Sequence, residues 1–446
     1  MRKAILIALL PAVLAAVQPA RAAGPIQTAV YVQGGDIPAD DAGANALFKR
    51  IKQSGASAVR LTISWRDIAP AQRPSEFQPK NPADTGYDWT STDREISLAI
   101  ANGLTPLVDV LTAPSWAGGK TVNASALGDF ATAITTRYSG SFEGLPRVRY
   151  WMVWNEPNLS LYLKPQVSGK KLVGAARYRS LVNSFASSAH AVRSDNVVVA
   201  GLVAPFTFRN DPGPLKFMKA VLSARTEFDV WSVHPYTSGG PRHHAFKSTD
   251  VSLGDLPKAK RMLDAAVRAH HVVSRHPVQF WVTEFSWDSK PPDSGGVPLT
   301  LESQWVSEGL FRAWQAGVSM FTWFLLRDDP KGSPYQSGLY FRSWTPKPAL
   351  AAFRFPFVAL RKAKSVYVWG RTPGGVPATA VIERRSGRSW KRVAMVKTSS
   401  SGVFARTLPL RLPSSAFMRA RISGAASIAF PLRLPPDRFV DPFGAG

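Results

Sequence analysis

Short apolar segments recur along most of the chain, and segments with helical periodicity lie between them. The apolar segments are nearly continuous rather than alternating, which is typical of strands buried on both faces of a parallel sheet. The predicted strands span residues 28–33, 58–64, 105–111, 148–154, 197–202, 228–233, 278–283 and 318–323. The predicted helices include 93–102, 178–192, 256–271 and 302–316. Eight strand–helix repeats predict a (β/α)8 TIM barrel, an α/β fold.

The pattern changes beyond residue 360. Short segments rich in Val, Ile, Phe and Arg are separated there by turn residues such as Gly374 and Gly387. Short strands with regular turn signals predict a small antiparallel, all-β sandwich. We therefore expect a barrel domain at 25–360 and a C-terminal accessory β-sandwich domain at 361–446. A buttress for the barrel and a carbohydrate-binding module are both open roles for the sandwich.

The first residues have the pattern of a secretory signal peptide. Arg2 and Lys3 precede an apolar stretch at 4–17, and small residues follow around Ala22. The stretch is shorter than the roughly 20 residues that span a bilayer, so a membrane anchor is the weaker interpretation. We expect cleavage of residues 1–22, a secreted or cell-wall-associated protein, and no stable membrane insertion.

Composition adds two constraints. The chain has no cysteine, which excludes disulfides and thiolate metal sites. Its formal net charge is +25, and residues 361–446 contain 16 Lys and Arg against three acidic residues, a local balance of +13. Such a field attracts anionic polymers. A basic surface without a specific partner is the first interpretation, and binding of an anionic cell-wall polymer through the C-terminal domain is the alternative. Nucleic acid is disfavoured, since no nucleic-acid motif occurs and export is expected.

Two glutamates stand where a TIM barrel carries its chemistry. Glu156 follows the fourth predicted strand and Glu284 ends the seventh. The C-terminal ends of barrel strands form the active site, so these side chains would face each other across the barrel mouth. A pair of carboxylates on either side of a glycosidic bond is the machinery that hydrolyses it. We therefore predict an enzyme that cleaves O-glycosidic bonds.

The residues around these glutamates resemble the retaining glycoside hydrolases of clan A. The resemblance covers about residues 28–360 and is closest to family 39, with family 5 cellulase-like enzymes as second choice. It rests on the motifs Arg60-Leu-Thr-Ile-Ser-Trp65, Tyr87-Asp-Trp89, Trp154-Asn-Glu-Pro-Asn158, His234-Pro-Tyr236 and Phe321-Thr-Trp323. It implies double displacement through a glycosyl-enzyme intermediate, with Glu156 as acid/base and Glu284 as nucleophile.

Neighbouring residues would support these two roles. Arg60 would keep Glu284 ionised, and the phenol of Tyr236 would donate a hydrogen bond to it. Partial desolvation and the nearby negative charge would raise the pKa of Glu156. Asn155 would hydrogen-bond the 2-hydroxyl of the sugar.

Three other side chains are candidates for binding the substrate. Trp323, at the end of the eighth strand, is expected to be a platform on which a sugar stacks. The resemblance also implies a cis peptide between Trp323 and Phe324. His234 is expected to contact the substrate, with a strand-end hydrogen-bonding role as its alternative. Trp116 would either line a subsite or anchor a loop, and the long loop at 70–86 would form a wall of the groove.

Metal and cofactor chemistry are not expected. His243 and His244, together with His234, hint at a metal site, but the Gly- and Pro-rich segment at 238–242 predicts a solvated loop instead. A non-catalytic glycan- or cell-wall-binding protein on a degenerate hydrolase barrel is the alternative function. The presence of both glutamates favours activity. Sugar and linkage specificity, endo or exo action, and hydrolysis or transfer to another sugar all stay open.

Overall fold

The structure is a computed structural model that describes residues 24–330 and 332–441. The predicted signal peptide at residues 1–22 lies outside the described residues. Within the described ranges, every helix is too short or too polar to cross a bilayer.

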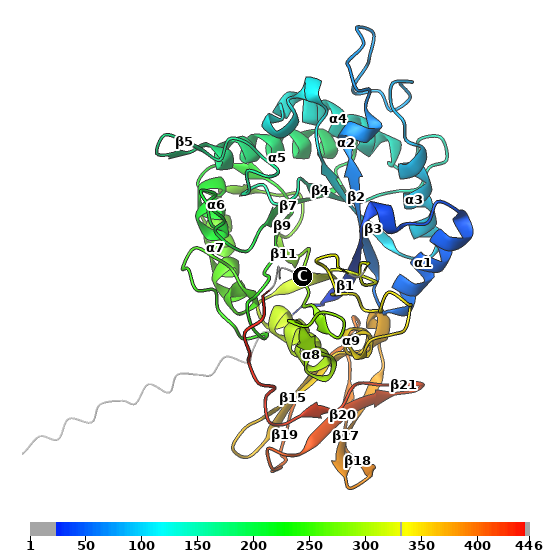
Figure 1. Cartoon of the computed structure of the whole chain (residues 1–446), viewed down its shortest axis with the longest axis vertical. Helices are drawn as coiled ribbons and strands as arrows, with labels where there is room; N and C mark the ends of the chain where they lie inside the picture. Colours follow the sequence, from blue (N-terminus) through cyan, green and yellow to red (C-terminus); the bar gives the residue numbers. More distant parts are fainter. Residues whose placement is uncertain (1–23, 331, 442–446) are drawn as a thin grey trace, which may run out of the picture.

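Eight parallel strands close into a barrel (Figure 1), which confirms the predicted (β/α)8 fold. They are β1 (Gln27–Val32), β2 (Ala58–Ser64), β3 (Thr105–Leu111), β4 (Tyr150–Val153), β7 (Val197–Val203), β9 (Val230–Val233), β11 (Gln279–Val282) and β14 (Val318–Trp323). Each strand pairs with the next one, and β14 pairs with β1 to close the ring. Glu156 and Glu284 therefore follow the fourth and seventh strands of the barrel.

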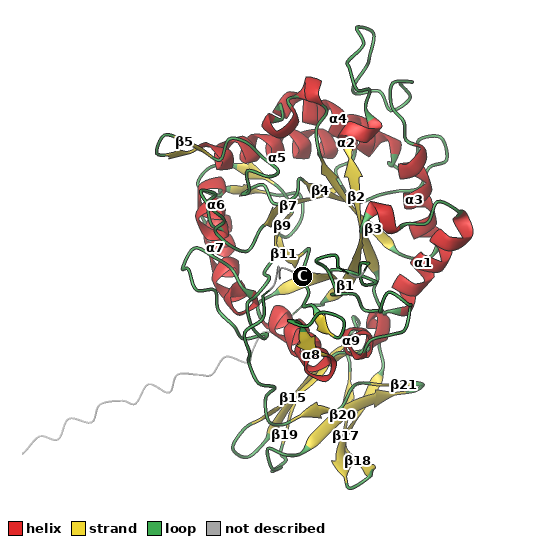
Figure 2. Cartoon of the chain, viewed as in Figure 1, coloured by secondary structure: helices red, strands yellow, loops and turns green. Residues whose placement is uncertain are grey.

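Helices surround the barrel as an outer ring (Figure 2). They are α1 (Asp41–Gln53), α2 (Trp65–Ile68), α3 (Thr90–Ala101), α4 (Ala124–Arg137), α5 (Val173–Val192), α6 (Pro214–Val221), α7 (Leu256–Arg268), α8 (Leu299–Gln315) and α9 (Pro348–Arg354). Asp40 and Asn123 cap α1 and α4 by accepting hydrogen bonds from backbone N–H groups. Two-residue strands occur in the connections: β5 (Val167–Ser168), β6 (Lys171–Leu172), β8 (Thr226–Glu227), β10 (Val272–Val273), β12 (Ser289–Lys290) and β13 (Val297–Pro298).

Apolar side chains fill the inside of the barrel. This inner cluster is separate from the larger core between strands and helices. Its buried members are Ala29, Ala58, Leu107, Met152, Val197, Val199, Leu202, Val230, Trp281 and Met320. A filled barrel is a packed core and not a pore, so chemistry is confined to its ends.

The C-terminal domain consists of antiparallel sheets, as predicted. One sheet contains β15 (Phe357–Arg361), β16 (Val366–Arg371) and β19 (Val403–Leu408); the other contains β17 (Thr379–Ser386), β18 (Ser389–Lys397), β20 (Phe417–Ile422), β21 (Ala425–Ala426) and β22 (Phe430–Pro431). Its first strand, β15, begins within the range expected for the barrel domain. Trp369 packs on Phe311 and Trp314 of α8, with ring centroids 5.5 and 5.6 Å apart. The domain is thus joined to the barrel through a buried aromatic interface.

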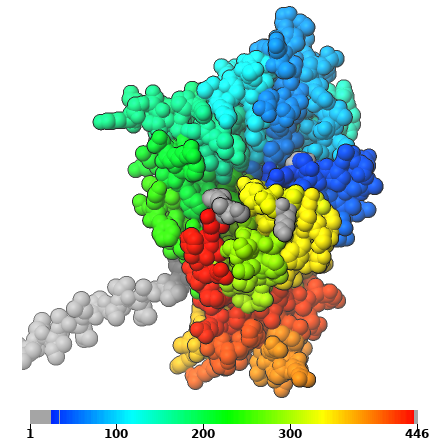
Figure 3. Space-filling model, viewed as in Figure 1, coloured from blue at the N-terminus to red at the C-terminus, as the bar shows by residue number. Residues whose placement is uncertain are grey.

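After β22 the chain returns to the barrel (Figure 3, red). The backbone N–H of Gly240 donates to the carboxylate of Asp437, and that of Val440 donates to the carbonyl of Ser238. Trp305 of α8 donates its indole N–H to the carbonyl of Pro436. The segment 239–241 is buried as a result. The expectation of a solvated loop is therefore wrong at 239–241, which a segment distant in sequence covers, whereas His244 is exposed as expected.

Candidate active site

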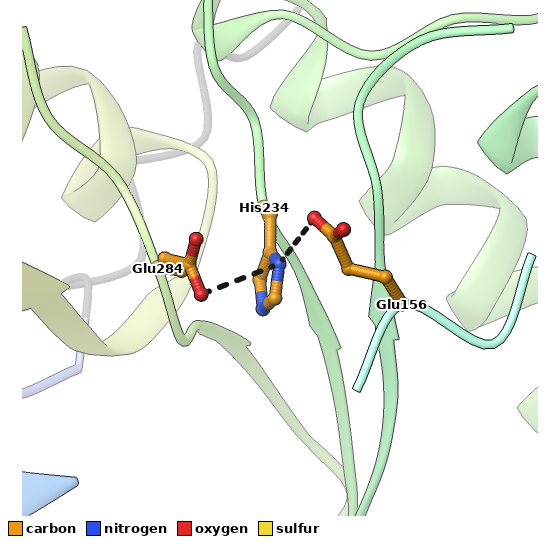
Figure 4. A group of neighbouring side chains, drawn as sticks. All are labelled: Glu156, His234 and Glu284. Atoms are coloured by element: carbon orange, nitrogen blue, oxygen red, sulfur yellow. Dashed lines mark hydrogen bonds and ion pairs between the residues drawn. The ribbon is translucent and has the colours of Figure 1, made fainter. Parts of the chain in front are cut away.

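Glu156 and Glu284 converge at the C-terminal end of the barrel. Their carboxylates point toward the imidazole of His234 from opposite sides (Figure 4). A carboxylate oxygen of Glu156 and one of Glu284 lie within 4.8 Å of each other. Each of the two side chains exposes 15% of its surface. The pair is close to the roughly 5 to 5.5 Å separation of retaining glycosidases and is open to solvent.

Two side chains hold the carboxylate of Glu284. Arg60, on β2, donates from Nη1 to Oε2 at 2.9 Å, and the phenol of Tyr236 donates to Oε1, also at 2.9 Å. Both contacts had been expected from the sequence. A cation and a hydrogen-bond donor favour the ionised form of a carboxylate, which is the form that attacks an electrophilic carbon.

Arg60 is the centre of a wider network. Its Nη2 atom donates to Asp109 Oδ2 at 2.6 Å and to Asn155 Oδ1 at 2.8 Å. The guanidinium also lies 4.8 Å from the ring centroid of Tyr31. Burial alone would lower the pKa of Arg60, but the carboxylates of Asp109 and Glu284 raise it above its ordinary value. Arg60 therefore stays charged although it is buried.

Asp109 was not among the predicted site residues. It is a buried carboxylate within the apolar strand β3, and Arg60 occupies the neighbouring strand. A lone acidic residue inside an otherwise apolar strand is a signal that could have identified it, because such a group needs a buried partner. Asn155 turns its carbonyl oxygen toward Arg60, so its amide group is left to donate elsewhere.

The environment of Glu156 differs from that of Glu284. Burial raises the pKa of Glu156 to about 7, and Arg60 acts in the opposite direction. The rise predicted from desolvation is therefore present. A carboxyl group that titrates near neutrality can both donate and accept a proton, as an acid/base catalyst must.

Glu156 is one of four non-glycine residues with positive φ at this end of the barrel. They are Thr112 (54°), Trp154 (69°), Glu156 (42°) and Leu202 (48°), at the ends of β3, β4 and β7. Such conformations cost on the order of 1–3 kcal/mol each and concentrate at functional sites. The N–H of Glu156 donates to the carbonyl of Leu202 at 3.0 Å, which fixes two of these residues together. Strained backbone therefore lies at the strand ends beside and at Glu156, and no sequence pattern predicted it.

His234 lies between the two carboxylates but has no exposed surface. Its Nδ1 atom is 3.2 Å from Glu156 Oε1 and 3.9 Å from Glu284 Oε2. Burial lowers its pKa to about 3, so the ring is neutral at ordinary pH. The prediction that His234 contacts the substrate is wrong, because a side chain without exposed surface cannot touch a sugar. The alternative, a hydrogen-bonding histidine at a strand end, is what the structure shows.

The three groups Glu156, His234 and Glu284 also have the ligand types of a cation site. The charged guanidinium of Arg60 lies 2.9 Å from Glu284 Oε2, however, where it would repel a bound cation. This donor set fits acid–base chemistry better than metal binding. His243 and His244 do not join it, since they face Asp437 and Asp255 instead.

The prediction that Trp323 is a platform for a sugar is wrong. It exposes 1% of its surface, donates its indole N–H to the carbonyl of Ser337, and packs on Phe353 of α9. The non-proline cis peptide joins Phe324 to Leu325, one residue later than expected. Phe324 stacks on Tyr31, with ring centroids 5.2 Å apart. Phe324, the residue after β14, thus lies beside Tyr31, whose ring centroid is 4.8 Å from the guanidinium of Arg60.

Trp116 anchors a loop, which is the second of its two expected roles. Its indole N–H donates to the carbonyl of Pro70 at 2.8 Å, and its ring packs edge-on against Trp65 and Phe77. The long loop at 70–86 is therefore fixed to the barrel. Trp116 is not among the residues that approach Glu156 or Glu284 in the described interactions.

Two tyrosines of the mouth were missed. Burial raises the pKa of Tyr162 and of Tyr335, and the charges of Glu156 and Glu284 raise both further. A small pocket of about 110 Å³ lies beside Tyr162 and Trp154. Its lining includes Trp154, two residues before Glu156. Both tyrosines are on loops, where no periodicity marks a functional residue.

No known family profile matches the sequence, and no curated protein matches it. Solved structures do resemble it. A family 39 glycoside hydrolase from Bacteroides cellulosilyticus WH2 superposes with a TM-score of 0.56 at 16% identity, covering 94% of this chain and 81% of that one. A monomeric beta-xylosidase from Caulobacter crescentus CB15 gives 0.54 at 17%, covering 88% and 96%. A GH39 enzyme from Xanthomonas axonopodis pv. citri gives 0.53 at 15%, covering 87% and 93%.

These likenesses define the class of fold. The chain has the fold of the family 39 glycoside hydrolases of clan A, which confirms the resemblance seen in its motifs. At such low identity the likeness concerns the fold alone. The chemistry has to be argued from the residues of the site.

Proposed function

We propose that the chain is a secreted retaining glycoside hydrolase. The observation that carries the proposal is the pair of carboxylates within 4.8 Å of each other at the ends of β4 and β11. The two are in different environments, since Glu284 is held by a cation and a phenol while burial raises the pKa of Glu156. Different environments give two carboxylates different roles.

In the first step the carboxylate of Glu284 attacks the anomeric carbon. The bond from that carbon to the glycosidic oxygen breaks, and Glu156 transfers its proton to the departing oxygen. Arg60 and Tyr236 hold the carboxylate of Glu284 in place before the attack. The products of this step are a glycosyl ester on Glu284 and a free leaving group.

In the second step water enters on the side of Glu156. Glu156, now deprotonated, removes a proton from the water while the water oxygen attacks the anomeric carbon. The ester bond breaks and Glu284 regains its charge beside Arg60. Two inversions restore the original configuration. A sugar hydroxyl in place of water would give transfer by the same steps.

The substrate class that we propose is an oligo- or polysaccharide with an O-glycosidic bond. Two similar structures are described as a beta-xylosidase and a glucosidase, which supports this breadth and does not narrow it. Export through the predicted N-terminal signal peptide would place the enzyme where such polymers occur.

The test is a screen of the mature protein against aryl glycosides and polysaccharides, run in parallel with Glu156→Gln and Glu284→Gln. We expect at least one substrate to be cleaved, and both variants to lose that activity. Cleavage that persists at the wild-type rate in both variants would refute the mechanism. Binding of a glycan without cleavage of any substrate would instead support the non-catalytic alternative.

A further inference from the structure

The hairpin between β17 and β18 concentrates positive charge. Within residues 384–392, which we call the cationic hairpin, five of nine side chains are cationic: Arg384, Arg385, Arg388, Lys391 and Arg392. It lies at the end of the C-terminal domain that is remote from the barrel (Figure 1). All five except Arg384 are exposed. This is a surface separate from the catalytic mouth.

Nearby carboxylates of the same domain do not neutralise the charges of the cationic hairpin. The nearby carboxylate of Glu383 is already held by Arg419 and Arg421, at 2.8 and 3.2 Å. In the described part of the chain, none of the five hairpin cations forms an ion pair. Arg384 stands directly opposite Lys391 in the strand register. Like charges opposite each other destabilise a sheet, so these side chains do not hold the hairpin together.

Folding of the domain depends on the other side chains of these strands. Ala380 and Ile382 of β17 and Met418 and Ala420 of β20 are buried between the sheets. The outer face carries the half-buried ring of Trp390, with the guanidinium of Arg419 4.3 Å from its centroid. A flat ring among exposed cations combines a stacking surface with charge, the two features that bind an anionic sugar chain.

We infer that the cationic hairpin binds a linear polysaccharide carrying carboxylate groups and thereby tethers the protein to it. Charge complementarity is the reason for the anion. A repeating anion engages several of the cations at once, which a single small anion cannot do. Bound carboxylates would also relieve the repulsion between Arg384 and Lys391. The choice of a polysaccharide over another polyanion rests on the proposed function.

The experiment measures binding of the full mature chain to polygalacturonate by affinity electrophoresis at several salt concentrations. The variant Arg388→Gln/Lys391→Gln/Arg392→Gln removes three hairpin cations. Its matched control, Lys170→Gln/Lys171→Gln/Arg261→Gln, removes three exposed cations of the barrel. Neutral dextran and double-stranded DNA serve as comparison probes, and thermal unfolding verifies that both variants are folded.

We expect the hairpin variant to bind polygalacturonate at least about tenfold more weakly, since each cation contributes on the order of 1 kcal/mol near an anionic surface. The slope of log Kd against log salt should fall by roughly 2, as for three lost ionic contacts to a single-stranded polyanion. The control should bind like wild type, and dextran should not bind.

Equal weakening of both variants would overturn the inference, because net charge and not the hairpin would then be responsible. Tighter binding to DNA than to polygalacturonate would also overturn it, in favour of a nucleic-acid surface. The measurement requires no turnover. Hairpin-dependent binding by a protein that cleaves no substrate would therefore support this inference while refuting the proposed hydrolase.

Discussion

The barrel contains two buried histidines, each placed between two carboxylates, at its opposite ends. At the N-terminal end, His190 lies 2.9 Å from Glu227 and 3.0 Å from Asp229, so both ring nitrogens have partners. At the mouth, His234 has one partner at hydrogen-bond distance, and its Nε2 atom is buried without one among the described residues. The same residue types thus form a satisfied cluster and an unsatisfied one.

The two clusters also differ in charge. Burial would lower the pKa of His190, but its hydrogen bonds with Asp229 and Glu227 raise it above the ordinary value. Burial lowers the pKa of His234 to about 3, and the positive charge of nearby Arg60 acts in the same direction. Asp229 is further held by the N–H of Val198. The cluster around His190 is a closed network of charges, whereas at the mouth Glu156 is partly exposed and burial raises its pKa to about 7, as the proposed acid/base role requires.

The largest expected effect comes from breaking the pair at the mouth. Glu284→Gln should lower kcat by about 10⁴-fold or more, because the nucleophile is lost. Glu156→Gln should lower it by about 10²- to 10⁴-fold, with most of the loss recovered on substrates whose leaving group needs no proton. Steady-state kinetics measure both. Glu143→Gln, in the exposed loop before β4, is the control and should retain wild-type kcat.

The reverse experiment breaks the cluster at the other end. His190→Asn should lower the free energy of unfolding by about 3 kcal/mol, because it leaves Asp229 buried with its charge partner removed. Activity per folded molecule should be unchanged. Denaturant unfolding gives the difference, and His244→Asn, at an exposed ion pair, should cost less than about 1 kcal/mol.

The pH dependence of that difference has a defined sign. The folded pKa of His190 is raised, so its stabilisation is complete below the unfolded pKa of about 6.5 and is lost as pH rises through the folded value. The difference in the free energy of unfolding between wild type and His190→Asn should therefore become smaller at alkaline pH. An equal gap at acid and alkaline pH would contradict a charged His190.

The third effect is on the pH dependence of activity, which should report the titration of Glu156 at the mouth. Glu156 has a pKa of about 7 and must be protonated to assist the leaving group. We expect kcat/KM for an unactivated substrate to fall roughly tenfold per pH unit above pH 7. The pH–rate profile of Glu156→Gln should lack this alkaline limb. A limb that survives in the variant would assign the titration to another group.

The smallest effect concerns the segment that covers the loop after β9. Asp437→Asn weakens the acceptor of the Gly240 N–H, close in sequence to Tyr236. The free energy of unfolding should fall by about 1 kcal/mol. Tyr236 keeps its own hydrogen bond to Glu284, so kcat should fall less than about fivefold. That corresponds to an increase of less than about 1 kcal/mol in the activation free energy. Arg438→Gln, the exposed neighbour on the same segment, should change neither quantity.

The barrel could be predicted because its strands are nearly continuous apolar runs. The bounds of β2, β3 and β14 agree with the predicted ones, and strand order followed from the fold class. Glu156 and Glu284 stood out because a carboxylate at the end of a buried strand is costly. The contact of Glu284 with Arg60 followed from the same placement.

Other features depend on information that the sequence does not display. The sequence pattern gave the bounds of β14 correctly but did not show that Trp323 is buried against Phe353 of α9. Asp109 and Arg60 meet only once β2 and β3 are in register. The contact of Asp437 with Gly240 joins segments far apart in the chain, and no local periodicity marks either one.

The proposed mechanism requires that Glu284 become covalently bonded to a sugar. Once a cleaved glycoside is known, a 2-deoxy-2-fluoro analogue with a reactive leaving group should slow the second step and let the ester accumulate. Peptide mass spectrometry should then find one added glycosyl group on Glu284, and none in Glu284→Gln. A label on any other residue, or a first-formed product of inverted anomeric configuration, would refute the mechanism.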